Sequence, residues 1–279
     1  ASAFTAPRGA GSGHREMAQG PSVRTQRDIA WTAPPRASRA HARLAAELGA
    51  VDTMWDRYTG VPLRIWGAGI AAPGSVHSGP AALRAARQLL ADHLALLAPG
   101  SRVADFELVG DDLHAGVRSL GFVQRHAGRP VLGGQLSLRF KRDRLIAVAS
   151  EALPDIRVEL AASVIADDLA RARARAWILA LDAPVSATAG AVDGPFILPI
   201  LVPGQRPRYR EVVRVIVDSA APIGRHAVYL DSATGEPVAR DPLLHFASGS
   251  ILFNVPQRGP QGARLDLPAP LLGLFVNGV

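Results

Sequence analysis

The alternation of apolar and polar residues is clearest within residues 121–150, where it predicts a meander of short antiparallel strands. Leu136, Leu138 and Phe140 fall on one face of the middle strand and polar residues fall on the other, which is the period of a half-buried strand. Gly133 and Gly134 interrupt this pattern and predict a bulge or a close backbone approach. The predicted strands cover residues 122–126, 131–140 and 145–148.

Two other stretches repeat apolar residues every three to four positions, as an amphipathic helix does. Residues 80–97 form the clearer one, with Ser78 as a candidate N-cap and Pro80 in the first turn. Residues 160–181 form the second, with Ser163 as a candidate N-cap. Acidic residues near its start and arginines further along agree with the helix dipole.

Two predicted hairpins, in residues 51–67 and 226–238, contain the same turn pattern. Asp and Thr side chains in such a turn can bond the turn amides, while Gly takes the left-handed conformation. The repeat indicates two related turns, although four matched positions can also recur by chance. The first turn comprises Asp56, Thr59, Gly60 and Pro62, and the second comprises Asp231, Thr234, Gly235 and Pro237.

Shorter apolar runs predict three further strands, at residues 104–109, 195–202 and 209–217. Asp111 and Asp112 follow the first of these runs and are predicted to form a solvated turn. Neighbouring carboxylates on a turn point apart, so we expect no acid–base chemistry from this pair.

Together these elements predict an α+β fold of two small modules, each a helix packed on an antiparallel sheet, behind a flexible N-terminal tail. A chain of 279 residues is longer than one small domain requires. The tail is rich in Gly, Ala, Ser, Pro and Arg, with one docked segment expected near residues 29–31. The predicted boundaries are 1–48 for the tail, 49–154 and 155–245 for the modules, and 246–279 for a Pro/Gly-rich junction and strand leading towards a following domain.

Composition excludes several function classes. The net charge of +7 comes almost entirely from arginine, but the arginines are spread along the chain and only three tyrosines could stack on bases, so we expect no nucleic-acid partner. No run reaches the roughly 18 apolar residues of a membrane span. Without cysteine, neither a disulfide nor a Cys-ligated metal can form.

Motifs for catalysis are also missing from the sequence. None of the eight histidines forms an H-E-x-x-H zinc motif, and neither a G-x-S-x-G elbow nor a phosphate-binding loop is present. The sequence therefore predicts no catalytic residue, no metal ligand and no cofactor. A Ser-His-Asp triad can be dispersed along a chain, so an unrelated hydrolase remains an alternative.

The meander contains Gln124, Gly128, Pro130, Val131 and Gly133 in this order, followed by the alternating strand 135–140. This pattern resembles the fungalysin/thermolysin propeptide (FTP) domain. The hairpin at residues 51–67, with its D-x-x-T-G-x-P turn and the following Trp66-Gly67, resembles a strand that this family has in the same place. The second predicted module, which ends in Y-x-D-x-x-T-G-E, resembles a PepSY-type domain, and such a domain commonly follows FTP in metalloprotease precursors.

The resemblance, over about residues 51–245, implies the pro-region of a secreted zinc metalloprotease of the thermolysin/fungalysin type. Such a zymogen segment acts as an intramolecular chaperone and as an active-site inhibitor until it is cleaved. The segment would itself be no enzyme, although the full precursor would be a zinc metalloendopeptidase. The small residues at the start, Ala1 to Ala3, suit a bacterial extracellular protein after removal of a signal peptide.

The implied partner is the cognate zinc metalloprotease catalytic domain. A free-standing PepSY-type protease inhibitor or binding protein is the main alternative. The residues expected to face the protease or to carry the family motif are Gln124, Arg125, Pro130, Val131, Gly133, Asp56, Thr59 and Gly60.

Overall fold

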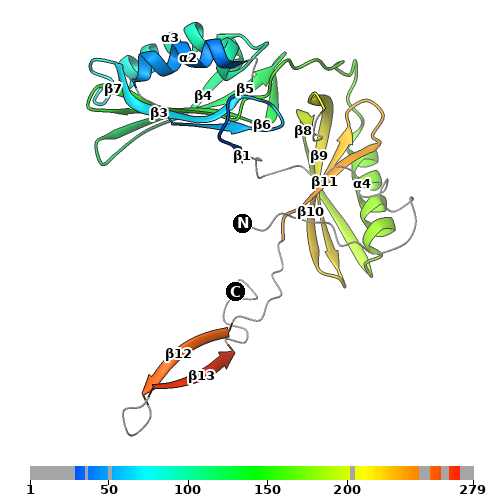
Figure 1. Cartoon of the computed structure of the whole chain (residues 1–279). Helices are drawn as coiled ribbons and strands as arrows, with labels where there is room; N and C mark the ends of the chain where they lie inside the picture. The colour runs from blue at the N-terminus through cyan, green and yellow to red at the C-terminus, as the bar shows by residue number, and fades with distance from the viewer. Residues whose placement is uncertain are drawn as a thin grey trace.

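A computed structural model describes residues 29–34, 37–49, 52–201, 205–244, 252–258 and 264–270. Strands dominate this part of the chain (Figure 1). The helices are α2 (Ser38–Leu48), α3 (Gly79–Leu97), α4 (Asp167–Asp182) and a short 3-10 turn, η2 (Val103–Asp105). The strands are β1 (Ile29–Ala30), β2 (Asp52–Asp56), β3 (Pro62–Ala71), β4 (Phe106–His114), β5 (Val117–His126), β6 (Arg129–Lys141), β7 (Arg144–Ser150), β8 (Ser186–Ile200), β9 (Arg208–Ala220), β10 (Gly224–Asp231), β11 (Pro237–Pro242), β12 (Leu252–Arg258) and β13 (Arg264–Pro270).

Eleven of these strands belong to one sheet, in the order β1-β2-β3-β7-β6-β8-β9-β10-β11, with β5 pairing β6 and β4 pairing β5 beside this path. Every pairing in it is antiparallel except β6 with β8, which run parallel where Val131 lies opposite Ile197. Strands β12 and β13 form a separate hairpin.

The prediction of two modules, each with one helix on its own antiparallel sheet, is therefore wrong. The strands of both predicted modules join into one sheet, because β6 pairs with β8. Val131 and Ile197, the residues that pair, lie in a buried apolar cluster. Two helices, α2 and α3, lie over the N-terminal part of this sheet, and only α4 lies beside β8 to β11 (Figure 1).

The predicted flexible tail is wrong at its C-terminal end, where residues 38–48 form α2. Leu44 and Leu48 are one helical turn apart and both are fully buried against the sheet. The other positions of this helix are alanines and polar residues, so its apolar stripe is hard to see in the sequence. Residues 1–28 lie outside the described part of the chain, as does the apolar stretch 271–279.

The helices cover two separate clusters of buried side chains. The larger cluster lies under α2 and α3 and includes Trp55, Leu90 and Phe140. The cluster under α4 includes Ile178 and Val215. Among the described residues, no helix combines the length and apolar character that crossing a membrane requires.

Local predictions for the meander and the first long helix are confirmed. Ser78 Oγ accepts a hydrogen bond from the Ala81 amide at 3.3 Å, as an N-cap should. The predicted turn at Asp111 and Asp112 is wrong, because both lie inside β4, where Arg118 of the neighbouring strand pairs with Asp111. The chain turns instead at Ala115 and Gly116, both with positive φ.

Candidate functional site

A buried glutamine fixes the path of the chain out of the N-terminal part of the sheet. Gln124 Nε2 donates to the Leu153 carbonyl at 2.9 Å, and its Oε1 accepts from the Leu153 amide at 2.8 Å. Nε2 also lies 3.0 Å from Ser101 Oγ. A Cβ at Gly134 would come within 2.7 Å of Gln124 Oε1, so the close approach predicted at this glycine is confirmed.

The connecting segment, residues 151–166 between β7 and α4, runs after Leu153 into a junction between β6 and the C-terminal strands. Val131 packs with Leu153, Ile197 and Tyr209 in a buried cluster, and all four side chains are less than a tenth exposed. The Tyr209 hydroxyl donates to the Pro154 carbonyl at 2.5 Å. The cluster thus joins the meander, the connecting segment and β9 into one unit.

A buried carboxylate strengthens the same junction. Glu211 is 4% exposed, and its Oε1 accepts from Arg129 Nε at 2.9 Å. Its other oxygen accepts from the Ala161 amide at 2.7 Å. Because burying an unpaired charge is costly, these contacts keep β6, β9 and the connecting segment together.

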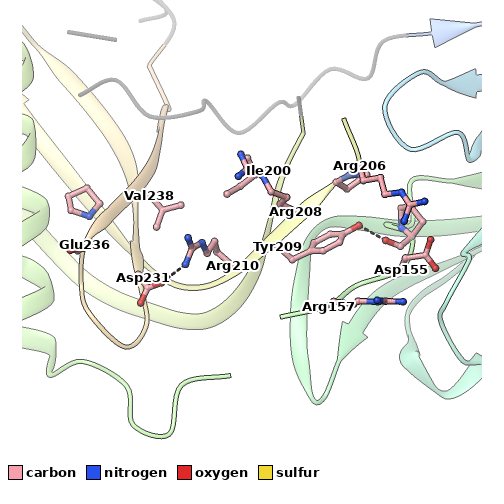
Figure 2. A pocket seen from close by; sticks show the side chains of 13 residues that line it. Asp155, Arg157, Ile200, Arg206, Arg208, Tyr209, Arg210, Asp231, Glu236 and Val238 are labelled. Atoms are coloured by element: carbon pink, nitrogen blue, oxygen red, sulfur yellow. Dashed lines mark hydrogen bonds and ion pairs between the residues drawn. The ribbon is translucent and has the colours of Figure 1, made fainter. Parts of the chain in front are cut away.

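An open cleft of about 830 Å³ lies beside this junction (Figure 2). Its size is within the usual range of roughly 300–1,000 Å³ for ligand sites. Its walls come from the connecting segment, the ends of β8 and β9, and the turn between β10 and β11. The lining residues are Pro154, Asp155, Arg157, Ile200, Arg206, Pro207, Arg208, Tyr209, Arg210, Asp231, Glu236, Pro237 and Val238.

The cleft has a different charge at each end. Figure 2 shows Arg157 and Arg206 at one end with Asp155, and Asp231 with Glu236 at the other. Tyr209 and Val238 add apolar surface between the charged ends.

The arginines of the cleft differ in their pairing. Arg210 lies 3.8 Å from Asp231, which is a long ion pair. Among the described residues, no ion pair joins Arg157, Arg206 or Arg208 to a carboxylate, and all three side chains are exposed. Three guanidinium groups are therefore available to a ligand.

The acidic end of the cleft is formed by the second of the two repeated turns. Asp231 Oδ1 accepts from the amides of Ala233 and Thr234, and Thr234 Oγ1 accepts from the Glu236 amide at 3.2 Å. Gly235 has φ +70°. The turn chemistry predicted for this sequence pattern is confirmed here.

The first repeated turn has the same bonding but a different location. Asp56 Oδ1 accepts from the Tyr58 and Thr59 amides at 2.8 and 3.2 Å, and Thr59 Oγ1 accepts from the Val61 amide. Asp56 and Thr59 are almost fully buried, and Gly60 has φ +65°. None of these residues lines the cleft.

The residues predicted to face a protease thus fall into separate places. Asp56, Thr59 and Gly60 form the first turn, and Gln124 and Val131 are buried at or near the junction. Pro130 lies opposite Arg125 in the β5–β6 pairing, and Gly133 takes φ +73° within β6. Most of these positions build the scaffold, and their contact with a protease stays a prediction.

Among the residues predicted to face a protease, Arg125 has an exposed charged group. Its guanidinium donates to Glu107 and, at 3.0 Å, to the Gly128 carbonyl, and its side chain is 38% exposed. It therefore lies on the surface next to β4.

Strand β4 forms an open edge of the sheet within the described part of the chain. It pairs with β5 on one side and with no strand on the other. Val109 and Leu113 are 60% and 44% exposed, and the pairing with β5 shifts register between Leu108 and Gly110. An edge with exposed apolar residues can accept a further strand.

His226 lies beside Asp182 and Arg240 at the end of α4. His226 Nε2 is 3.7 Å from Asp182 Oδ2, which also accepts from Arg240 at 2.5 Å. Burial lowers the pKa of His226, and Arg240 lowers it further, while Asp182 acts in the opposite direction. Burial also lowers the pKa of His41. No group of three or more His, Cys, Asp or Glu residues suited to a metal ion occurs among the described residues.

Sequence reasoning missed the arginines of the cleft. Arg206 and Arg208 lie between the strands predicted at residues 195–202 and 209–217, and Arg157 is far from them in the chain. The density of arginine around Tyr209 was the available signal. The pairing that brings this stretch to the connecting segment was not visible in the sequence.

Comparison with known proteins adds little to this picture. No protein-family model matches the chain, and no curated protein matches it. Among solved structures, the chain is similar to the Bacillus megaterium YpeB C-terminal domain, with 12% sequence identity, a TM-score of 0.32, and coverage of 70% of this chain and 77% of that chain. A TM-score this low carries no argument about function, and the resemblance to FTP and PepSY domains stays a hypothesis.

Proposed function

We propose that this chain is the pro-region of a secreted thermolysin/fungalysin-like zinc metalloprotease, which assists folding of the protease domain and inhibits it until cleavage. The observation that carries the proposal is the open edge of β4. A strand with one unpaired side and exposed apolar residues can add an extended segment of another chain through main-chain hydrogen bonds.

The motif residues support this role as scaffold. Gln124 and Val131 hold the connecting segment and the junction, so the strands beside them have a fixed shape. A rigid surface loses little conformational entropy on binding. Such a surface stabilises a native-like partner by mass action, because it binds the folded protease domain and not the unfolded chain.

The test uses the full chain and the catalytic domain of the metalloprotease encoded with it. The protease domain is refolded with and without the chain, and both recovered activity and inhibition of the native enzyme are measured. We expect a higher refolding yield and inhibition at micromolar concentration. The absence of both effects would refute the proposal.

Two double variants localise the contact. Val109→Lys with Leu113→Lys places charge on the β4 edge and should weaken inhibition about tenfold or more. Val185→Lys with Ile223→Lys changes two apolar side chains that are 84% and 68% exposed elsewhere, and should leave inhibition within about twofold. Equal effects of the two variants would exclude β4 as the contact.

A free-standing protease inhibitor would use the same surface. Inhibition by the chain without any gain in refolding yield, in a gene that encodes no protease domain, would favour that alternative.

A further inference from the structure

We propose that the cleft at the junction binds an extended peptide segment of another polypeptide through a carboxylate group that docks at the end formed by Arg157 and Arg206, with Arg208 as a further cation along the cleft. This site is separate from the β4 edge. It does not rest on the proposed function, because it requires no protease.

The arginine end of the cleft determines the charge of the ligand. Two exposed guanidinium groups, those of Arg157 and Arg206, lie there without an ion pair to any described carboxylate, and Asp155 is the acidic residue beside them. Arg208, also exposed and without such an ion pair, lies nearer the middle of the cleft beside Ile200. A guanidinium group offers a planar pair of donors that matches the two oxygens of a carboxylate. An acidic side chain, or a C-terminal carboxylate, therefore fits this end.

The rest of the cleft favours a peptide over a small anion. Apolar surface from Ile200, Tyr209 and Val238 lies between the two ends and suits aliphatic side chains. At the far end lie Glu236 and Asp231, and Asp231 is paired with Arg210, so this end offers a second negative charge less attraction than the Arg157 end does. The volume of about 830 Å³ gives room for a short segment of a few residues.

The cleft is formed before any ligand arrives. Asp231 is fixed by the turn amides, and the Tyr209 hydroxyl is bonded to Pro154. Glu211 accepts from the Ala161 amide and so holds the strand that carries Arg208 against the connecting segment that carries Arg157. Groups held in position in this way lose little entropy when a peptide binds.

The experiment measures binding of a fluorescein-labelled octapeptide, in which glutamate alternates with alanine and valine, by fluorescence anisotropy on the full chain. The same peptide with lysine in place of glutamate is the charge control. N-acetylglutamate and inorganic phosphate are tested as competitors. We expect the glutamate peptide to bind and the lysine peptide to bind at least about tenfold more weakly.

Charge-reversal variants assign the site. Arg206→Glu with Arg208→Glu should weaken binding of the glutamate peptide about tenfold or more, and Arg157→Glu should weaken it independently. The matched control, Arg84→Glu with Arg87→Glu, makes the same change of charge on the exposed face of α3 and should alter binding less than about twofold. Circular dichroism checks that each variant keeps the fold.

Several results would overturn the proposal. One is no binding of the glutamate peptide at millimolar concentration, and another is equal binding of the two peptides. Equal losses in the cleft and α3 variants would show a general charge effect. If phosphate or N-acetylglutamate binds as tightly as the peptide, the cleft is a site for simple anions and not for a polypeptide.

Discussion

The side chain of Gln124 and the backbone of Leu153 form a two-bond clasp, with the carboxamide donating to the Leu153 carbonyl and accepting from its amide. Both partners are buried, at 1% and 0% exposure. The clasp determines where the chain leaves the meander, and so where one wall of the cleft begins.

Replacing Gln124 should lower the free energy of unfolding. Gln124→Ala leaves two backbone groups of Leu153 buried without their partner, and we expect a loss of about 2–3 kcal/mol in the free energy of unfolding, measured by urea denaturation. Gln88→Ala is the matched control, because Gln88 bonds Asp92 on the exposed face of α3. It should cost less than about 0.5 kcal/mol, and a similar loss in both variants would contradict the structural role of the clasp.

Removal of the buried carboxylate should destabilise the junction. Glu211→Ala leaves Arg129 and the Ala161 amide without their acceptor, and we expect a loss of about 2–3 kcal/mol, below the range for fully buried pairs because Arg129 is 36% exposed. Glu107→Ala removes an equivalent strand glutamate from an exposed pair and should cost less than about 1 kcal/mol. Urea denaturation of both variants tests the difference, and equal losses would show that burial of Glu211 is not what matters.

Two glycines with similar φ separate backbone strain from steric overlap. Gly235→Ala and Gly116→Ala both force a Cβ into a left-handed conformation, at φ +70° and +73°, at a cost of about 1–2 kcal/mol. A Cβ at Gly235 would also lie 2.1 Å from Ile165 Cδ1, whereas nothing lies within 4 Å of one at Gly116. Gly235→Ala should therefore lose about 1–3 kcal/mol more than Gly116→Ala in thermal or urea unfolding. Equal losses would mean that Ile165 moves aside at no cost.

Stability should fall in mild acid through His226. Its pKa is lowered in the folded protein below the ordinary value of 6.5, so the unfolded chain binds the proton more readily. The contribution of neutral His226 to folding stability is fully present above pH 6.5. It is lost as the pH falls from 6.5 through the lowered pKa of the folded protein. His226→Gln should show a smaller loss of stability than the unmodified chain between pH 7.5 and pH 5, measured by urea denaturation at each pH.

The control for that measurement is His114→Gln, which removes an exposed imidazole at the end of β4. His41, whose pKa is also lowered by burial, keeps its own contribution in both variants. An identical acid-induced loss in the His226→Gln variant and the unmodified chain would refute the assignment.

Short-range patterns were readable from the sequence, because they depend on neighbours in the chain. The Ser78 cap, the repeated Asp–Thr–Gly turns and the meander follow from local spacing and are confirmed. Where tertiary contacts compete with local preference, the predictions were wrong. The second helix begins at Asp167, not near residue 160, because the Ala161 amide bonds Glu211 and the Ile165 amide bonds the Ser232 carbonyl.

Local patterns in the sequence could not predict how the N-terminal and C-terminal strands join into one sheet. One parallel pairing between Val131 and Ile197 joins strands that are 66 positions apart, and no local pattern signals it. The cleft depends on that pairing, since its arginines come from the connecting segment, the loop before β9 and β9 itself. Residue types alone showed that arginines were available, but not that three of them share one site.

The non-covalent character of this junction has a consequence for limited proteolysis. A single cut near Glu159 would break the backbone, yet the Val131 cluster and the Glu211–Arg129 pair on either side of the cut would remain. The nicked protein should therefore migrate as one particle in gel filtration, and its two fragments should part only in denaturant.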